Sequence, residues 1–368
     1  MFAPSTADLL DELKDYSKRF LVLPDEICHD VLAAWICHSY VIDALPATPR
    51  LALLSPEPGS GKTRVLEVLQ LLCERPLLAA NASSAAMFRL ISTDQRPTLL
   101  LDESDTYLLP GSKGYRDDLR GVIDAGYRPG SQIVRCEPPS MRPGLFETYS
   151  AVAIAGLGRL PNTILERSIV FWMHKRARSE KVEPFRWRVQ HVHTELLRER
   201  LNTWADENLQ AIDDLLSGHP LRGLEDLGDR AAEIWEPLLA IAVLAGTQWQ
   251  QRLEHAAKRL ANTATASEQT LGVRLLADIR SLLNGHDRIA STELAKVLNE
   301  MEESPWGGWP LDARTLARKL KPYGIGPQQI RLGDRTCKGY LTGDFADPWD
   351  RYLPLAETTE TSETAPRY

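Results

Sequence analysis

"LALLSPEPGSGKTRVLEVLQ", residues 51–70, passes from an apolar run through a glycine-rich turn into a helical pattern. In this context GSGKT at 59–63 predicts a phosphate-binding loop, in which backbone N–H groups and a helix N-terminus hold phosphate oxygens. We expect Lys62 to reach the β- and γ-phosphates of a nucleotide and Thr63 to bind Mg²⁺. Pro56 stands where the motif asks for glycine, so the loop is expected to begin along a different path. The expected nucleotide-binding residues of this segment are Gly59, Ser60, Gly61, Lys62, Thr63 and Arg64.

A second stretch, TLLLDESD at residues 98–105, places two acids directly after an apolar run. Carboxylates that leave a buried strand predict a magnesium site and a reacting water. We expect Asp102 to hold Mg²⁺, usually through water, and Glu103 to orient and deprotonate the water that attacks the γ-phosphate. DESD also spells an element of superfamily 2 helicases, but those enzymes need a second nucleotide-facing α/β domain, and the pattern after residue 185 is helical. The two stretches together predict an ATP hydrolase that uses ATP and Mg²⁺.

Apolar runs of strand length alternate with helical patterns between residues 50 and 174. RLALLS, PTLLLDE, YSAVAIAG and SIVFWM predict a parallel sheet covered by helices on both faces. The expected fold class is α/β: a P-loop NTPase core of the AAA+ kind, with a helical lid, the linker ANTATASEQT and a C-terminal winged-helix domain. The expected segments are a helical N-terminal region 1–47, the ATPase core 48–178, the lid 179–265, the winged-helix domain 270–352 and a disordered tail 353–368.

Two arginines fit a ring-shaped ATPase. Arg167 ends a short helix just before a strand, where AAA+ proteins place the arginine finger that reaches the γ-phosphate of a neighbouring subunit; a surface charge at a helix C-terminus is the alternative. Arg230 begins an apolar helix of the expected lid and suits a sensor that swings onto the nucleotide, or a salt bridge with Asp226 or Asp229. The expected catalytic residues are Lys62, Glu103 and Arg167.

Two basic regions are candidates for binding DNA. A hairpin expected near 132–136 and 145–149, with Arg142 in its tip, lies where superfamily 3 helicases insert a hairpin into the pore of their ring. The winged-helix region 311–340 carries seven basic residues against two acids and fits duplex binding. A surface loop and a protein-docking module are the respective alternatives. The candidate DNA-binding residues are Arg128, Arg135, Arg142, Arg318, Lys319, Arg331, Arg335 and Lys338.

Composition limits the classes of function. The chain of 368 residues has 43 Lys and Arg against 50 Asp and Glu, a net charge of −7, so any DNA contact must come from local basic patches. The basic strip 174–176 is expected to be solvated charge. The five cysteines lack the spacing of metal or disulfide sites, and no apolar run approaches membrane-spanning length. We therefore expect a cytoplasmic protein with buried thiols and no membrane contact.

Taken in order, five runs in this sequence resemble a helicase-like ATPase domain of phages, plasmids and actinobacterial genomes, often fused behind a primase-polymerase domain. The runs are PRLALLSPEPGSGKT, TLLLDESDT, AIAGLGRLPNTILERSI, RAAEIWEPLLAIA and KGYLTGDF. The resemblance, over roughly residues 20–352, implies ATP hydrolysis linked to the replication of mobile DNA. The nucleotide roles it implies fall on Lys62, Thr63, Asp102, Glu103 and Arg167. Because no primase segment is present in this chain, a primase or polymerase partner would be a separate protein, or absent.

The expected function is that of a magnesium-dependent ATPase acting on DNA as an oligomeric helicase or translocase. A hexameric ring would hold single-stranded DNA in its pore and duplex at the winged helix. One alternative is a non-translocating AAA+ switch, such as a helicase loader or replication initiator. A phosphotransferase using the same loop is the other, although the Asp-Glu pair argues against it. Strand displacement on a forked substrate separates the first two functions.

Overall fold

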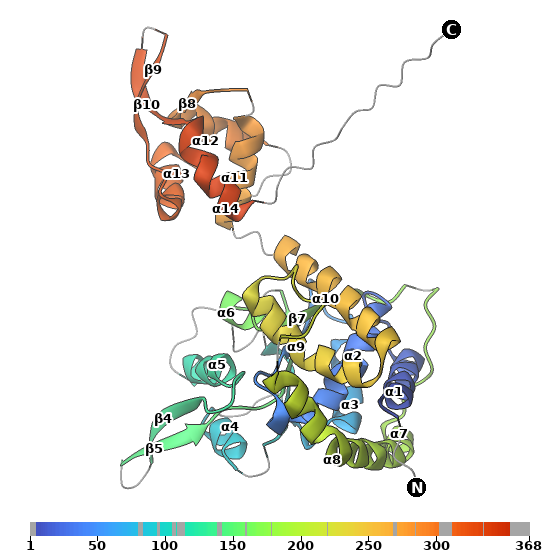
Figure 1. Cartoon of the computed structure of the whole chain (residues 1–368). Coiled ribbons are helices and arrows are strands. Elements are labelled where there is room, and N and C mark those ends of the chain that lie inside the picture. The colour runs from blue at the N-terminus through green and yellow to red at the C-terminus, as the bar shows by residue number, and fades with distance from the viewer. Residues whose placement is uncertain are drawn as a thin grey trace, which may run out of the picture. The chain divides into compact units, whose positions relative to one another are not determined.

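The computed structural model of the chain describes residues 5–353, apart from 80–83, 94–95, 105–107, 109–114, 138–141, 159, 178, 219, 268–270, 284, 302–310 and 334. It divides into two compact units, residues 1–264 and 265–368, and Figure 1 labels their elements. The expected tail 353–368 lies outside the described residues except for its first position. In the part of the chain that is described, no helix is long and apolar enough to cross a membrane.

A mixed α/β architecture with a five-stranded parallel sheet forms the first unit. The strand order is β2–β3–β6–β1–β7. The strands are β1 Arg50–Ser55, β2 Pro76–Ala79, β3 Thr98–Leu101, β6 Val152–Leu157 and β7 Ser168–Trp172. All but β2 coincide with the apolar runs noted in the sequence, β6 ending one residue beyond its run; β2 is a short, partly exposed edge strand and gave no such signal. From β1 the chain crosses to β2 at one edge, and β7 lies on the other side of β1, so the loop after β1 leaves the sheet where ligands commonly bind in α/β folds.

Successive residues of the strands point to opposite faces of the sheet and fill two cores. In β1, Leu51 and Leu53 belong to the larger core, whereas Ala52 and Leu54 belong to the smaller one. The larger core includes α1 Thr6–Phe20, α2 Ile27–Tyr40, α3 Lys62–Leu72, α8 Glu195–Ser217, α9 Asp229–Leu244 and α10 Thr247–Ser267. The smaller core includes α4 Ser84–Ile91, α5 Tyr115–Ala125 and α6 Asn162–Leu165. A short 3-10 turn, Ile42–Ala44, follows α2, and α7 Trp187–His193 precedes α8.

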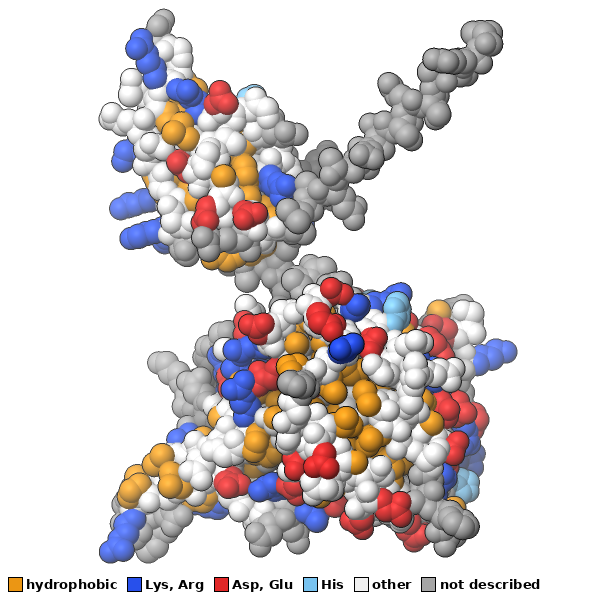
Figure 2. Space-filling model, in the orientation of Figure 1, with side chains coloured by type: hydrophobic (Ala, Val, Ile, Leu, Met, Phe, Trp, Pro, Cys, Tyr) orange, Lys and Arg blue, Asp and Glu red, His pale blue; other side chains and the backbone are white. Residues whose placement is uncertain are grey.

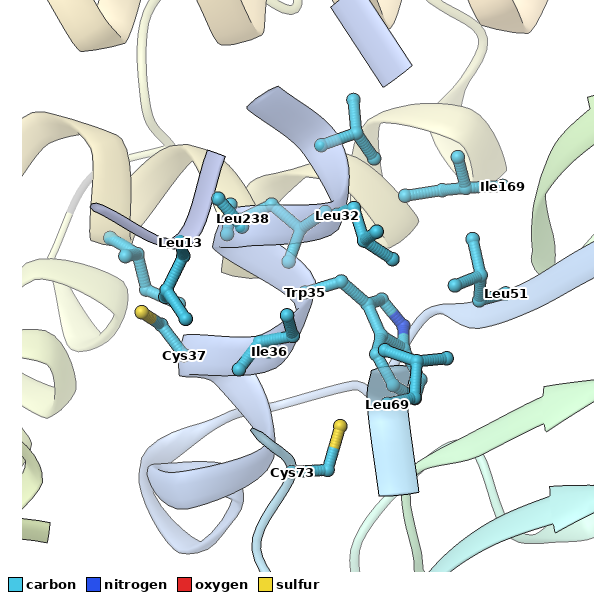
Figure 3. Close-up of a cluster of buried hydrophobic side chains, with 14 of the residues drawn as sticks. Leu13, Leu32, Trp35, Ile36, Cys37, Leu51, Leu69, Cys73, Ile169 and Leu238 are labelled. Atoms are coloured by element: carbon cyan, nitrogen blue, oxygen red, sulfur yellow. The ribbon is translucent and has the colours of Figure 1, made fainter. Parts of the chain in front are cut away.

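Trp35 stands at the centre of the larger core. Its side chain is fully buried, its Nε1 donates to the Pro49 carbonyl at 3.0 Å, and Figure 3 shows it between Leu51 of β1 and Leu69 of α3. Leu238 of α9 contributes to the same cluster. The N-terminal helices and the helices of the expected lid therefore share one core with the sheet.

A separate antiparallel hairpin, β4 Gln132–Glu137 and β5 Arg142–Glu147, rises between α5 and β6. The sequence placed its second strand at 145–149 and Arg142 in the tip; the structure corrects both, since Arg142 is the first residue of β5 and pairs with Glu137. The reason is register: Phe146 packs on Phe88 of α4 with ring centroids 4.7 Å apart, which draws this strand toward the core earlier than the proline-rich pattern suggested.

The second unit joins helices to a three-stranded antiparallel sheet in the order β8–β10–β9. The sequence predicts helices near 271–284, 291–302 and 312–321 followed by a hairpin, and the structure has all four; β8 and the last helix, Ala346–Tyr352, were not foreseen. The elements are α11 Leu271–Leu282, β8 Arg288–Ala290, α12 Ser291–Glu300, α13 Ala313–Leu320, the 3-10 turn Lys321–Tyr323, β9 Gln328–Leu332, β10 Arg335–Leu341, the 3-10 turn Thr342–Phe345 and α14 Ala346–Tyr352.

The structure corrects part of the expected linker ANTATASEQT, residues 261–270. Helix α10 continues to Ser267, so residues 261–267 are helical. Their alanines favour a helix that is already nucleated, and threonine lowers helix propensity too little to end it.

Candidate functional site

Two glycines shape the loop between β1 and α3. Gly59 and Gly61 have φ values of +77° and +86°, a backbone region that residues with a Cβ rarely adopt. A Cβ at either position would meet only side-chain atoms at 3.9 and 4.0 Å, so conformation rather than space requires glycine. Helix α3 begins at Lys62, directly after the turn, so its N-terminal N–H groups and the positive end of its dipole face the loop.

The Lys62 side chain lies over this loop and is only 8% exposed. Its Nζ donates to the hydroxyl of Ser55 and, at 3.2 Å, to that of Ser60. The Ser55 hydroxyl in turn donates to the Glu57 carbonyl at 2.7 Å. Hydroxyl groups from the end of β1 and from the loop thus hold the ammonium beside the two glycines.

The acids that follow β3 reach the same place. Thr63 Oγ1 donates to Asp102 Oδ2 at 3.0 Å, although the two residues are 39 positions apart. Asp102 Oδ1 accepts the backbone N–H of Glu103 at 2.8 Å. Hydroxyl and carboxylate oxygens are the hard ligands that Mg²⁺ takes beside substrate phosphates. The structure therefore brings together the two residues expected to hold the metal, and their chemistry fits it.

Glu103 has an unusual backbone. Its φ is +54°, and its side chain is exposed just beyond the end of β3. A left-handed conformation costs a non-glycine residue about 1–3 kcal/mol and tends to occur at functional sites. Asp102 thus contacts the loop hydroxyl, whereas the Glu103 side chain is exposed.

Neither a multi-ligand metal centre nor a disulfide occurs among the described residues. No group of three or more His, Cys, Asp or Glu side chains is placed to hold a metal there, so a Mg²⁺ at Thr63 and Asp102 would take its remaining oxygen ligands from phosphates and water. All five cysteines are free, and burial raises the pKa of Cys28 to about 12. Cys136 corrects the expectation of buried thiols, because it is exposed on β4.

A cavity of about 510 Å³ adjoins the loop. One side is formed by Gly59–Gly61 and Arg64, and the others by the end of α1 and by the segment between β7 and α7. The lining residues outside the loop and Arg64 are Phe20, Leu21, Val22, His174, Arg176, Val182, Glu183, Pro184 and Phe185. Sequence reasoning missed this cavity, because one wall, within residues 174–185, lies more than a hundred residues after the others; the aromatic Phe185 in a proline-flanked, charged segment was the available signal.

The basic strip after β7 also lies at this loop. Lys175 Nζ pairs with Glu57 Oε2 at 2.9 Å, and His174 and Arg176 line the cavity. The expectation of merely solvated charge is therefore incomplete: the strip adds positive charge around the place where phosphates are expected.

Arg167 lies at the N-terminal end of β1 and β7, opposite the end of β1 from which the glycine loop leaves. It precedes β7, whose first residue pairs with Arg50 at the start of β1, whereas the glycine loop follows the end of β1. Six strand residues at ~3.3 Å each separate the two levels by about 20 Å, further than an arginine side chain reaches. The guanidinium stacks over the Tyr127 ring at 4.7 Å and donates to the Thr163 carbonyl.

Arg230 and Arg128 contact acids at this same end of the sheet. Arg230 lies 3.9 Å from Glu166, the residue before Arg167, and Arg128 pairs with Glu233 on α9. The hydrogen bond from Arg128 to Glu233 raises the pKa of the arginine. Arg128, predicted as part of a DNA-binding hairpin, therefore contacts α9 instead of extending along β4. The structure brings neither Arg128 nor Arg230 to Lys62.

The other DNA-binding candidates fall into two groups. On the hairpin, the register places Arg135 on the same face as Arg142, opposite the exposed Val134–Leu145 pair. In the second unit, basic side chains gather over α13 and the β9–β10 hairpin, as Figure 2 shows. Of the candidate residues there, Arg318, Arg331, Arg335 and Lys338 are exposed and Lys319 is half-buried.

The site and fold together define a mixed α/β protein in which a glycine loop after a central strand meets a carboxylate from a neighbouring part of the sheet. A family model described as "Protein of unknown function (DUF3631)" matches residues 172–352, from the end of β7 through the second unit. The "Uncharacterized 28.9 kDa protein in xis 5'region" of Saccharopolyspora erythraea is 37% identical over 189 residues, 50% of this chain and 70% of that protein. The chain belongs to the same family as this Saccharopolyspora protein.

Two solved structures are similar at a greater distance. "The apo structure of NrS-1 C terminal region (305-718)" is 12% identical, with 92% of this chain and 76% of that chain covered and a TM-score of 0.41. "The A form apo structure of NrS-1 C terminal region-CTR" is 12% identical over the same shares, with a TM-score of 0.40.

Proposed function

We propose that this protein is a magnesium-dependent ATPase of the P-loop, AAA+-like kind that acts on DNA as an oligomeric helicase or translocase. The observation that carries the proposal is the 3.0 Å hydrogen bond between Thr63 of the glycine loop and Asp102 after β3. It joins two motifs that have separate sequence signatures and one shared chemical purpose, which a chance glycine turn would not require.

Each residue of the site has a task in this reaction. The loop N–H groups and Lys62 bind the β- and γ-phosphates, and Thr63 and Asp102 hold Mg²⁺, which offsets the negative charge of the phosphates. Glu103, exposed beyond Asp102, accepts a proton from the attacking water. Hydrolysis also needs a hydrogen-bond donor for the negative charge that develops on the γ-phosphate. In our proposal the glycine loop and Lys62 do not supply this donor, so another group does.

A neighbouring subunit supplies that donor in our proposal. Arg167 is about 20 Å from its own loop by strand length. It lies with Arg128 and Arg230 at the opposite end of the strands. In a ring, the surface that carries these three arginines would face the nucleotide of the next subunit. We accordingly assign Arg230 to this subunit face and not to its own nucleotide.

Two readouts test the proposal. ATP hydrolysis that depends on Mg²⁺ and disappears in Lys62→Ala supports the ATPase, and strand displacement on a forked DNA substrate supports the helicase. An Arg200→Ala variant, altered in a pair with Glu12 on the outer helices, serves as a control for both. Wild-type protein that binds no ATP would contradict the ATPase assignment.

The non-translocating switch is the alternative kept open. The second unit, read as a winged helix, could dock a protein as well as a duplex. ATPase activity that responds to DNA without any strand displacement would favour a loader or initiator. A separate primase or polymerase remains the partner we propose for either form.

A further inference from the structure

The cavity beside the glycine loop is joined to the proposed phosphate site. Gly59, Ser60, Gly61 and Arg64 form its inner wall, so a nucleotide bound by its phosphates at Lys62 has this space within reach of its sugar and base. Its volume of about 510 Å³ falls in the range of small-molecule pockets, roughly 300–1,000 Å³.

Aromatic and apolar groups form the outer wall. The Arg64 guanidinium lies 4.4 Å from the centroid of the Phe185 ring, and the Phe20 ring meets Phe185 edge-on at 5.3 Å. Val22 and Val182 add apolar surface. A planar base fits such a wall, because rings pack on aromatic edges and on guanidinium planes.

The segment that carries Phe185 is fixed to α1. Glu183 accepts hydrogen bonds from Arg19 Nε at 3.0 Å and Arg19 Nη2 at 2.8 Å, and its backbone N–H donates to the Arg19 carbonyl at 2.7 Å. The hydrogen bond from Arg19 also lowers the pKa of the Glu183 carboxyl, so the pair stays charged. These contacts join residues 164 positions apart and preform the outer wall.

We propose that this cavity binds the base of the nucleoside triphosphate and selects a purine, which packs against Phe185 and Arg64 beneath the Arg19–Glu183 clasp. The proposal rests on the proposed function, because it assigns a partner surface to the nucleotide held at the glycine loop. A purine is favoured over a pyrimidine because its two fused rings cover more of the apolar wall. The end of α1 thereby becomes part of the nucleotide site.

The test compares ligands that share phosphates and differ in base. Isothermal titration calorimetry with Mg²⁺ measures the affinities of ATP, GTP, CTP and inorganic tripolyphosphate. We expect wild-type protein to bind the purine nucleotides more tightly than CTP or tripolyphosphate. Phe185→Leu, which keeps an apolar side chain in place, should weaken ATP roughly tenfold, the size of one stacking interaction between a base and an aromatic ring, and leave tripolyphosphate unchanged.

Two further variants keep the test decisive. Val22→Trp fills the cavity and should exclude ATP while sparing tripolyphosphate, and Trp187→Leu removes an exposed aromatic ring that does not line the cavity and should change neither. ATP and tripolyphosphate binding equally to wild type, or Phe185→Leu and Val22→Trp binding ATP as wild type does, would overturn the base site while leaving the phosphate site intact. Failure of wild type to bind either ligand would overturn the proposed function itself.

Discussion

At Glu103 the chain accepts a left-handed backbone, with φ of +54°, immediately after the residue that meets Thr63. The turn aims one carboxylate at the loop hydroxyl and leaves the other exposed. Substituting glutamine keeps the size of the side chain and a hydrogen-bonding oxygen but removes the carboxylate that we propose as the base.

We therefore expect Glu103→Gln to bind ATP with wild-type affinity and to hydrolyse it at least ~100-fold more slowly, the usual size of a general-base effect. Fluorescent-nucleotide binding and phosphate release measure the two quantities. Glu199→Gln on α8 is the matched control. A Glu103→Gln protein that turns over at the wild-type rate shows that another group is the base.

Two buried histidines predict how stability depends on pH. Burial lowers the pKa of both His29 and His38 from 6.5 to about 4. The unfolded chain therefore binds these protons more readily than the folded one, so their contribution to stability is complete above pH 6.5 and is lost as the pH falls toward 4. At 1.36 kcal/mol per unit, each histidine accounts for roughly 3 kcal/mol.

The expected result is a Tm that falls between pH 6.5 and pH 4, and falls less steeply in a His29→Gln, His38→Gln double variant. Glutamine can preserve hydrogen bonds such as the one between His38 and Thr48, 2.8 Å long in the structure. Thermal melts across this pH range measure the slope. The variant His255→Gln, at an exposed position, should melt like wild type. If Tm falls with pH equally steeply in the double variant and in wild type, groups other than these two histidines cause the loss of stability in acid.

At the scale of elements, the hairpin and the second unit offer two separable basic surfaces. Arg135 and Arg142 share one face of β4–β5, and the hairpin is anchored to the sheet unit through Phe146. Neutralising both arginines should abolish stimulation of ATPase by single-stranded DNA and leave duplex binding intact. ATPase assays with and without single-stranded DNA test this, and stimulation that survives would assign the hairpin to a surface role.

The second unit should behave in the opposite way. Neutralising Arg318, Lys319, Arg331 and Lys338 should weaken duplex binding and flatten its salt dependence by about 0.9 units of log-log slope for each phosphate that is no longer neutralised. Fluorescence anisotropy at a series of salt concentrations measures both effects. An unchanged slope would mean that this unit docks protein, and the switch would then be the better function.

Whether a feature could be predicted from the sequence depends on how close together in the chain its residues lie. The four strands other than β2 and the contact between Thr63 and Asp102 could be predicted, because apolar runs and motifs are each contained in a few residues. The cavity beside the glycine loop could not, since its walls are joined by the contact between the distant residues Arg19 and Glu183. The shared core around Trp35 and the pairing of Arg128 with Glu233 were hidden for the same reason: packing between distant segments decides them.

For the whole molecule, the position of Arg167 predicts an active site divided between subunits. Arg167→Ala should bind ATP normally and hydrolyse it poorly, because a finger in trans contributes roughly 10³-fold or more in related phosphoryl transfer. Mixing it with Lys62→Ala should restore part of the activity, since some interfaces then pair an intact loop with an intact finger. Activity of mixtures at several ratios measures this, and a fully active monomer would exclude it.

The core that α1 shares with α8 has a consequence during synthesis. Helix α1 packs against α2, which is made directly after it, but Trp204 of α8, whose Nε1 donates to the Thr6 hydroxyl at 3.0 Å, follows Thr6 by 198 residues. At about 5–20 residues per second, that interval is roughly 10–40 s. The part of α1 that Trp204 covers therefore stays open on the nascent chain for that time, and we expect chaperones that hold apolar segments at the ribosome to bind it.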